Sequence, residues 1–313
     1  MTLPHAALTP SGTNLWIDTG RRSAIALKNL IDKNIKTKDI LTSKAFENAM
    51  IVHAACGGST NLILHLPAVA HAVKENIMKV EDWIRINKLT PRLVDVLPNG
   101  PKGFPTSVFF SSGGVPEVML KLRNEGLLNL DVITSTGLTL KENLDWWEQS
   151  EKRDFVRKQL RNTRNIDPED VVHSLKNSKK KNMTSTVTFP KGNISPEGSV
   201  VKSTAIDKTV IDDDGVYRKI GPARIFISEA DAIKAVKDKG ENGVKAGDIM
   251  VIVCGGPKGT GMQEVAQITI ALKYLSYGKE VALITDGRFS GVSTGACIGH
   301  IGPEALDLSL IHI

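Results

Sequence analysis

Residues 141–182 divide the chain into two parts whose sequence patterns differ. The segment is charged and rich in asparagine, ends in a lysine-rich run and has almost no apolar periodicity, which predicts a surface helix followed by a solvated linker. Before it, apolar residues recur at helical spacing, whereas from Thr184 onward short β-rich runs alternate with turn residues. We therefore expect a truncated, helix-rich α/β domain at 1–150, a charged linker at 151–183 and a β-rich domain at 184–313.

Apolar spacing in the first part predicts several helices. They cover residues 21–31, residues 40–54, a stretch that begins at Ser59-Thr60-Asn61, and residues 117–124. Thr42 is a suitable N-cap for the second of these helices, which should stop at Cys56-Gly57-Gly58. Pro116 is suited to the first turn of the last helix.

The second part predicts more strands than helices. Its β-rich runs are TSTVTF, GSVVKSTAI, PARIFI, DIMVIV and EVALIT. Two helices interrupt these runs, one at 229–238 with Ser228 as its cap and one at 263–275. The pattern predicts a compact, barrel-like or sandwich domain with a few helices, incomplete at its end.

Composition excludes several classes of protein. The 40 lysine and arginine residues against 34 aspartate and glutamate residues give a net charge of +6, which is too dilute for a nucleic-acid surface. No apolar run reaches the roughly 18 residues of a membrane helix, and the N-terminus does not resemble a signal peptide, so we expect a cytoplasmic protein without membrane partners.

The three cysteines, Cys56, Cys254 and Cys297, lie too far apart in the sequence for a disulfide framework or a CxxC metal pair.

The first segment that could carry chemistry is Cys56-Gly57-Gly58-Ser59-Thr60-Asn61. Two glycines before a helix allow a ligand to approach the backbone, and the first-turn N–H groups with the Ser59 and Thr60 hydroxyls could hold an anion. The simpler interpretation, a turn followed by an N-cap, is favoured when the segment is considered alone. The segment is neither a P-loop nor a dinucleotide-binding motif.

The second segment, residues 255–264, places four glycines after the apolar run DIMVIV. Met262 and Gln263 stand where a P-loop has lysine and serine or threonine, so a nucleotide site is not expected. Glu264 could point at a cation bound by the loop, because hard cations take oxygen ligands. A glutamate favoured by the helix dipole is the alternative, and the residues alone favour it.

The third segment, residues 284–291, ends an apolar run in Asp-Gly and contains Ser290. Ser290 does not lie in a GxSxG motif, so a hydrolase triad with Asp286 and His300 has weak support. The seven histidines show no metal-ligand spacing. Three such glycine-rich strand-end loops in one chain nevertheless indicate a ligand site, because ligand sites concentrate on strand-end loops.

Several motifs occur in an order that resembles the dihydroxy-acid and sugar-acid dehydratase family. They are AFENAMIVHAACGGSTNLILHLPAVAHA, SSGGVPEVM, ISPEGSVVKSTAI, GGPKGTGMQE and ITDGRFSGVSTGACIGHIGPEA. The resemblance extends from about residue 20 to residue 305, and DWWEQSE with RFSGVSTG resembles the D-xylonate (pentonate) branch most closely.

The resemblance implies a lyase that removes water from a 2,3-dihydroxy carboxylate, here a small sugar acid, to give a 2-keto-3-deoxy acid. It implies an iron–sulfur cluster and Mg²⁺ as cofactors, and a homo-oligomer at full length. Glu264 matches the family's Mg²⁺ ligand and Ser290 its proton-abstracting base. Ser59 and Thr60 match a substrate-facing helix start, and Arg288 matches a substrate contact.

The chain also departs from the family pattern. The family's cluster cysteines and further Mg²⁺ ligands would precede residue 1, and none of Cys56, Cys254 and Cys297 matches a cluster ligand. Members are about twice as long, and the final LDLSLIHI matches nothing in them. We therefore expect an inactive fragment of a sugar-acid dehydratase. The alternatives are a dihydroxy-acid dehydratase of branched-chain amino-acid synthesis and a non-catalytic binding or dimerisation module.

Overall fold

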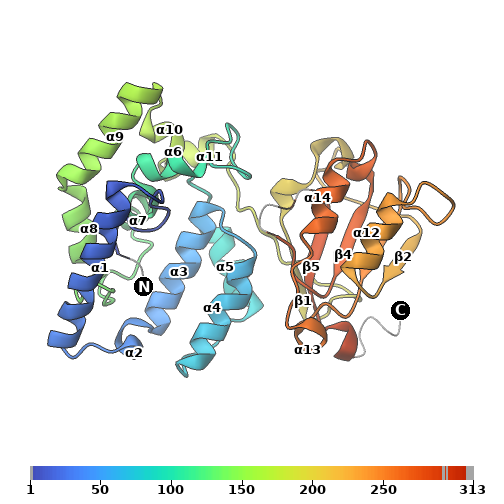
Figure 1. The fold of residues 1–313 in the computed structure, drawn as a ribbon, viewed down its shortest axis with the longest axis horizontal. Helices are drawn as coiled ribbons and strands as arrows, with labels where there is room; N and C mark the ends of the chain where they lie inside the picture. The colour runs from blue at the N-terminus through green and yellow to red at the C-terminus, as the bar shows by residue number, and fades with distance from the viewer. Residues whose placement is uncertain (1–2, 291–292, 294, 308–313) are drawn as a thin grey trace. The chain divides into compact units, whose positions relative to one another are not determined.

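The computed structural model describes residues 3–290, 293 and 295–307, which form two compact units (Figure 1). The first unit contains residues up to Gly57 and residues His65–Ser185, and the second contains Gly58–Leu64 and the residues from Thr186 onward. The final residues LDLSLIHI lie, apart from Leu306 and Asp307, outside the described residues. Among the described residues, no helix has the length and apolar character needed to span a membrane.

The first unit is built from helices. They are α1 (Asn14–Asp32), α2 (Thr37–Ile40), α3 (Ser43–Cys56), α4 (Asn61–Ala72), α5 (Val80–Leu89), α6 (Thr106–Ser111), α7 (Gly114–Asn124), α8 (Leu140–Glu148), α9 (Glu151–Arg164), α10 (Pro168–Val171) and α11 (Leu175–Lys180). The first four residues of α4 group with the second unit. The described residues of 1–150 contain isolated β-bridges but no strand, so a helix-rich part is confirmed and its α/β character is not observed.

Local sequence signals explain where these helices begin and end. The Thr42 side chain accepts a hydrogen bond from the backbone N–H of Ala45 and caps α3, as predicted. Gly57 ends the same helix with a φ of 62°, in the left-handed region that glycine adopts without strain. Pro116 lies in the first turn of α7, again as predicted.

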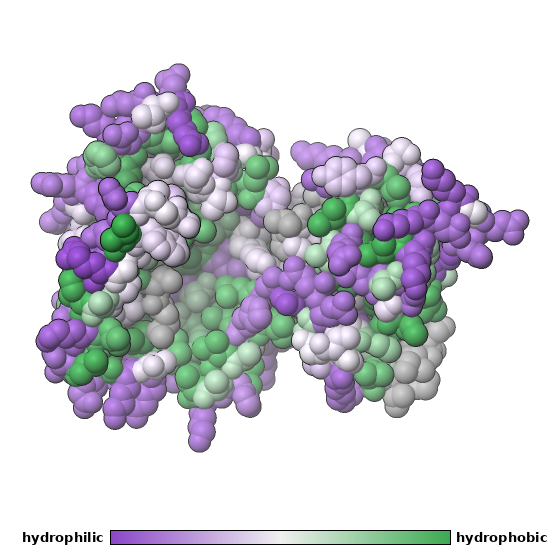
Figure 2. Space-filling model, in the orientation of Figure 1, coloured by the Kyte–Doolittle hydropathy of each residue, from purple (hydrophilic) through white to green (hydrophobic). Residues whose placement is uncertain are grey.

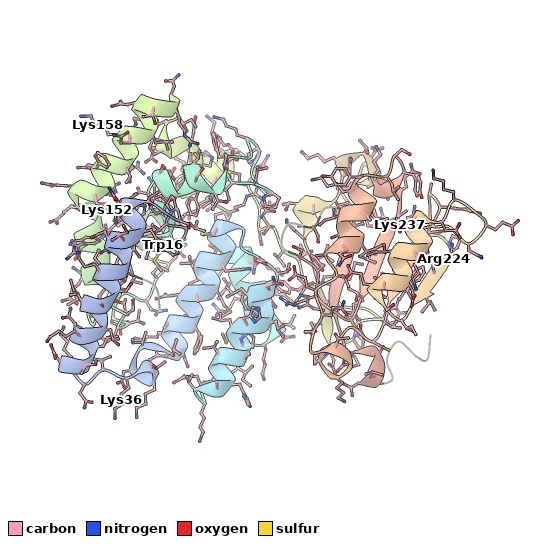
Figure 3. All side chains as sticks on the ribbon, in the orientation of Figure 1. Trp16, Lys36, Lys152, Lys158, Arg224 and Lys237 are labelled. Carbon is pink, nitrogen blue, oxygen red and sulfur yellow. The ribbon has the colours of Figure 1, made fainter. Side chains whose placement is uncertain are left out.

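Residues 151–183, which we expected to be a charged linker, form α9, α10 and α11 and group with the first unit. Charged side chains cover the outer side of α9, where Lys158 is exposed (Figure 3), and hydrophilic residues gather over this helix in Figure 2. Its inner side buries Val156 and Leu160. Two apolar residues one helical turn apart are enough to dock a short helix, although they produce too weak a periodicity to recognise in the sequence.

The second unit contains a five-stranded sheet in the order β1-β5-β4-β3-β2 (Figure 1). The strands are β1 (Gly198–Val201), β2 (Ala223–Phe226), β3 (Ile249–Ile252), β4 (Ala282–Thr285) and β5 (Cys297–Gly302). Strands β2 to β5 are parallel, and β1 pairs antiparallel with β5. The helices of the unit are α12 (Glu229–Lys237), α13 (Pro257–Thr260) and α14 (Gln267–Lys273), with short 3₁₀ turns at 203–205, 208–210, 278–280 and 305–307.

The expected barrel is not observed, because β1 and β2 form the two edges of the described sheet and the sheet is not closed. The runs DIMVIV and EVALIT supply parallel strands, which need a crossover connection, and α14 lies in the connection between β3 and β4. An apolar run does not show whether its strand pairs parallel or antiparallel with its neighbour. These runs are apolar because a parallel sheet covered by helices is buried. The run TSTVTF makes one isolated bridge, between Thr188 and Val201.

The core of the second unit lies between the sheet and its helices. It includes Met250, Ile252 and Leu283 from the strands and Ile268 and Leu272 from α14. The helix α14 begins at Gln267, four residues later than the predicted start at 263. The intervening residues pair with the loop after β4, since the N–H of Val265 donates to the carbonyl of Arg288 at 2.9 Å. This pairing positions the candidate site.

Candidate functional site

The three glycine-rich motifs come together within the second unit. The hydroxyl of Thr60 donates to the carbonyl of Phe289 at 3.1 Å, which joins the start of α4 to the loop after β4. The amide of Asn61 donates from Nδ2 to Oε2 of Glu264 at 3.1 Å, which joins the same helix start to the loop after β3. Glu264 and Arg288 form a parallel β-bridge between the two loops. Motifs from distant parts of the sequence therefore build one site.

One carboxylate oxygen of Glu264 has two partners, a hydrogen-bond donor and an ion-pair partner. Its Oε2 lies 3.2 Å from NH1 of Arg288 and accepts the amide of Asn61, and its side chain is 27% exposed. Arg288 is held at a second point, because its Nε donates to the carbonyl of Met262 at 2.9 Å. The predicted cation ligand and the predicted substrate contact thus form an ion pair in this structure.

The other predicted site residues are Ser59, Thr60 and Ser290. Their side chains differ in how much of their surface is exposed to solvent. Ser59 is exposed, and its hydroxyl accepts the backbone N–H of Asn61 at 3.2 Å, as in a helix cap. Thr60 is 1% exposed, so its hydroxyl ties two segments together from inside the protein. Ser290 is half-buried and follows Phe289 directly, with its carbonyl accepting the N–H of Ser293 at 2.9 Å.

Asp286 has a role that the motifs did not indicate. Its buried carboxylate accepts backbone N–H groups of Cys254 at 3.1 Å, Gly255 at 2.9 Å and Ala305 at 2.9 Å. A carboxylate committed to three backbone donors fixes the loops after β3 and β4 relative to the segment after β5. Asp286 therefore acts as a clamp, which here means a side chain that holds these three loop segments together. Because its carboxylate bonds to backbone N–H groups, the hydrolase triad gains no support.

His300 is the other residue of that hypothetical triad. Its Nε2 is buried without a hydrogen-bond partner. Burial, and then the positive charge of Arg288, lowers the pKa of His300 to about 4. The imidazole is therefore neutral near pH 7.

A second carboxylate, Glu304, supports the loop after β3. It accepts the backbone N–H of Lys258 at 2.8 and 3.0 Å, at the start of α13. A Cβ atom on Gly256 would lie 2.3 Å from Oε2 of Glu304, so glycine is required there.

The residues of the site fit a magnesium ion in part. Glu264 offers a carboxylate, and the side-chain oxygen Oδ1 of Asn61 is buried without a partner in its immediate vicinity. Both are the hard oxygen ligands that Mg²⁺ prefers. Among the described residues, no group of three or more histidine, cysteine, aspartate or glutamate side chains is arranged to hold a metal. Glu264 and Asn61 are thus two donors of a coordination sphere that needs more.

The cysteines of the chain do not fit an iron–sulfur cluster. Several cluster ligands must converge on one centre, whereas among the described residues no three histidine, cysteine, aspartate or glutamate side chains are arranged to hold a metal. Burial also raises the pKa of the Cys56 and Cys297 thiols. Cys254, at the end of β3, donates its backbone N–H to Asp286.

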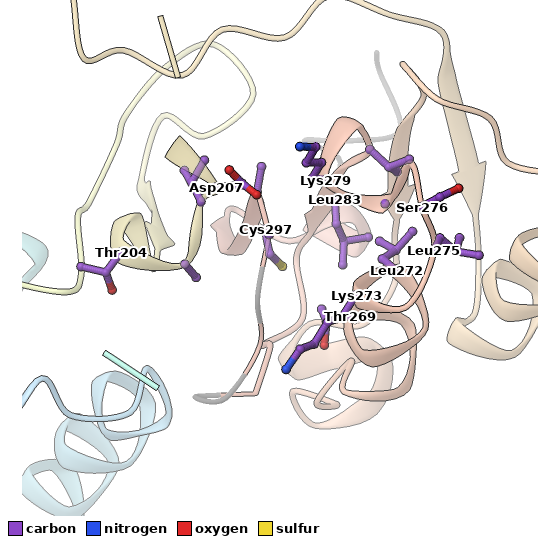
Figure 4. A pocket seen from close by; sticks show the side chains of 16 residues that line it. Thr204, Asp207, Thr269, Leu272, Lys273, Leu275, Ser276, Lys279, Leu283 and Cys297 are labelled. Carbon is purple, nitrogen blue, oxygen red and sulfur yellow. The ribbon is translucent and has the colours of Figure 1, made fainter. Parts of the chain in front are cut away.

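A separate cavity of about 430 Å³ lies on the second unit (Figure 4). Its lining comes from α14, the 3₁₀ turn at 203–205 and the strands β4 and β5, and includes Thr204, Asp207, Thr269, Leu272 and Cys297. None of Glu264, Arg288 and Ser290 is among its lining residues. The cavity and the site around the Glu264–Arg288 ion pair are thus different places.

The chain belongs to the dihydroxy-acid/6-phosphogluconate dehydratase family. The model of the family's N-terminal part matches residues 1–143, and the model of its C-terminal part matches residues 170–313. The two matches leave only the stretch around α9 uncovered.

Curated relatives include two proteins from Escherichia coli strain K12. The D-xylonate dehydratase YjhG is 59% identical over 307 residues, which are 98% of this chain and 46% of that protein. The D-xylonate dehydratase YagF is 56% identical over 306 residues, with the same coverage of both chains. A dihydroxy-acid dehydratase from Picrophilus torridus is 39% identical over 305 residues, 96% of this chain and 50% of that protein. The chain thus spans about half the length of the curated relatives it matches.

Proposed function

We propose that this chain forms part of a lyase that removes water from D-xylonate or a related pentonate and gives the 2-keto-3-deoxy acid. The observation that supports this proposal best is the 59% identity to a D-xylonate dehydratase over 98% of the chain. Dihydroxy-acid dehydratases match at 39–40% identity, which favours the pentonate as substrate. The substrate of this proposal is a small sugar acid.

The reaction removes a proton from the carbon next to the carboxylate and a hydroxyl group from the following carbon. The resulting enol then tautomerises to the 2-keto acid, so that one water molecule leaves overall. We assign the proton abstraction to Ser290. A serine hydroxyl is a weak base at neutral pH and needs positive charge nearby to favour the alkoxide. Arg288 brings a permanent positive charge to the same loop.

Arg288 also suits the recognition of the substrate carboxylate, because a guanidinium donates two parallel hydrogen bonds to a carboxylate. We place the substrate beside the first turn of α4, where the exposed hydroxyl of Ser59 can contact it. Thr60 contributes indirectly: its buried hydroxyl holds Phe289, the residue before Ser290.

Glu264 and Asn61 would hold Mg²⁺, which when bound stabilises the negative charge that develops on the substrate as the proton leaves. The described cysteines do not fit the iron–sulfur cluster that the family implies, and no step is assigned to it. We propose that the cluster ligands come from residues other than those of this chain. The 313-residue chain, supplied anaerobically with iron, sulfide and Mg²⁺, should therefore give no turnover of D-xylonate.

A chimera tests the proposed function. Residues 1–305 of this chain would replace the matching stretch of the E. coli D-xylonate dehydratase YjhG, and formation of 2-keto acid would be measured with D-xylonate and with 2,3-dihydroxy-isovalerate. We expect turnover of D-xylonate, loss of at least about 1,000-fold in kcat for Ser290→Ala, and no change for Ser276→Ala, an exposed serine of the same unit. A folded chimera that prefers 2,3-dihydroxy-isovalerate would contradict the substrate, and an active S290A chimera would contradict the base.

A further inference from the structure

Strand β2 forms one edge of the described sheet, and this edge is apolar. The strand lies at the end of the order β1-β5-β4-β3-β2 and pairs with β3 on one side (Figure 1). The side chains of Ile225 and Ile227 are 67% and 75% exposed, and Ala223 is exposed as well. Soluble proteins usually protect such an edge with charged residues, proline or a bulge, because its unpaired backbone groups can pair with another strand. An apolar edge therefore indicates an interaction surface.

The backbone of β2 shows which of its residues face this edge. The carbonyl of Phe226 accepts the N–H of Val253 at 3.0 Å, and the carbonyl of Pro222 accepts an N–H from the first residue of β3 at 2.8 Å. Because the N–H and C=O groups of successive residues point to opposite sides of a strand, the residues between these positions face away from β3. The three residues whose backbone groups face the free edge are Ala223, Ile225 and Ile227. None of them is a proline, so each offers both a donor and an acceptor.

We propose that β2 pairs antiparallel with β2 of a second copy of this chain, across a two-fold axis at Ile225. In this register Ile225 lies opposite Ile225 of the second copy, and Ala223 lies opposite Ile227 of the second copy. Both are hydrogen-bonded pairs of an antiparallel ladder, so the outward N–H and C=O groups of each strand gain partners. A two-fold axis brings the same surface of both copies together, which an antiparallel pair of identical strands allows.

The side chains of the two strands are complementary in this register. Ile225 lies in register with Val251 of β3, which lies in register with Ile284 of β4. Pairing at Ile225 extends this apolar row into the second copy and removes exposed apolar surface from water. On the opposite face of the strand, Arg224 lies across from Phe226 of the second copy, so the two arginines do not oppose each other.

Arg224 is the charged residue of β2, and its contacts leave the edge free (Figure 3). Its guanidinium donates to the carbonyls of Gly243 at 3.0 Å and Asn242 at 2.7 Å, and it lies 3.4 Å from the carboxylate of Asp248. The side chain is therefore held by the segment that follows α12, and Asp248 balances its charge. Because only residues 223–227 of each copy take part, the interface is small, and we expect a dimer that dissociates on dilution.

Sedimentation velocity of the 313-residue chain over a range of concentrations tests the proposal, and we expect a reversible equilibrium between monomer and dimer. Ile225→Lys should raise the dissociation constant of the dimer at least about tenfold, because two ammonium groups then face each other across the axis. Ile270→Lys is the matched control and should leave the constant unchanged, since Ile270 is 51% exposed on α14. Tyrosine absorbance in urea checks that both variants are folded. A chain that is monomeric at every concentration, or an I225K variant that dimerises like I270K, overturns the proposal.

Cross-linking tests the register with a smaller change to the strand. In the proposed pairing, the two Cα atoms of residue 225 lie about 5.5 Å apart, which suits a disulfide, whereas those of residue 227 lie more than about 10 Å apart. Ile225→Cys should therefore form a covalent dimer under mild oxidation, and Ile227→Cys should not. Both variants keep the native cysteines, so the original chain gives the background. Cross-linking of I227C as fast as that of I225C, or of neither above the background, overturns the proposed pairing.

Discussion

The hydroxyl of Thr60 donates a hydrogen bond to the carbonyl oxygen of Phe289, across 229 residues of sequence. Both residues are buried, with exposed fractions of 1% and 0%. The bond joins the start of α4 to the loop that carries Arg288 and Ser290. Through it, a short segment of the N-terminal third of the chain becomes part of the second unit and of the candidate site.

We predict that Thr60→Val lowers the free energy of unfolding of the second unit by about 1–2 kcal/mol. Valine has the shape of threonine but leaves a buried carbonyl without its donor. All three tyrosines, Tyr217, Tyr274 and Tyr277, lie in the second unit, so urea unfolding followed by tyrosine absorbance reports on it. Thr188→Val, at an exposed position of the same unit, is the control and should leave the midpoint unchanged. Equal midpoints for both variants would contradict the role of Thr60.

We predict a larger loss of stability, about 3 kcal/mol, for Asp286→Asn. The amide places an NH₂ group against backbone N–H donors that the carboxylate now accepts, and it removes the negative charge that strengthens those bonds. Hydrogen–deuterium exchange should become faster at Gly255 and Ala305 in particular. Asp213→Asn, at an exposed aspartate of the same unit, should change neither measurement. Unchanged exchange in D286N would show that the clamp is not needed.

In the first unit, we predict that Glu117→Gln costs about 3 kcal/mol. The Glu117 side chain is 2% exposed and pairs with Arg153 at 2.8 Å and Arg157 at 3.2 Å. Its neutralisation removes the nearest counter-charge of Arg153 and leaves the buried Arg157 with Glu169 alone. All four tryptophans lie in this unit, and their fluorescence follows its unfolding in urea. Asp154→Asn is the control, because Asp154 lies 4.0 Å from the same Arg153 and is 81% exposed. A midpoint for E117Q equal to that of D154N would count against a structural role of the buried pair.

Local signals predicted the parts of the fold that depend on neighbouring residues. The Thr42 cap and the Gly57 stop of α3 are confirmed, as is the Ser228 cap of α12. Such caps involve residues three positions apart, so a short stretch of sequence contains all their determinants. The family resemblance, rather than the local pattern, indicated Glu264 and Arg288, which the structure brings into contact.

Features that depend on distant residues could not be predicted in this way. The closed barrel was wrong because an apolar run does not specify whether its neighbour is parallel or antiparallel. The clamp of Asp286 and the support from Glu304 accept backbone N–H groups 31 and 46 residues away, and backbone donors leave no trace in the side-chain sequence. Asn61 stood inside a recognised motif, yet its contact with Glu264 spans 203 residues.

The last prediction concerns the dependence of stability on pH. Burial lowers the pKa of His5 from 6.5 to about 4, and the ring stacks on Phe110 and Trp147 while its Nε2 bonds to the carbonyl of Phe110 at 2.9 Å. In the unfolded chain the ring titrates near 6.5. Between these values the unfolded state binds more protons, so stability is complete above pH 6.5 and falls as the pH is lowered towards 4. The shift corresponds to about 3 kcal/mol.

Tryptophan fluorescence in urea at pH 7.0, 5.5 and 4.5 should show this loss of stability. His5→Phe should reduce the slope of the free energy of unfolding against pH. His71→Phe, at an exposed histidine of the same unit, should keep the original slope, and an equal slope for H5F would refute the assignment to His5.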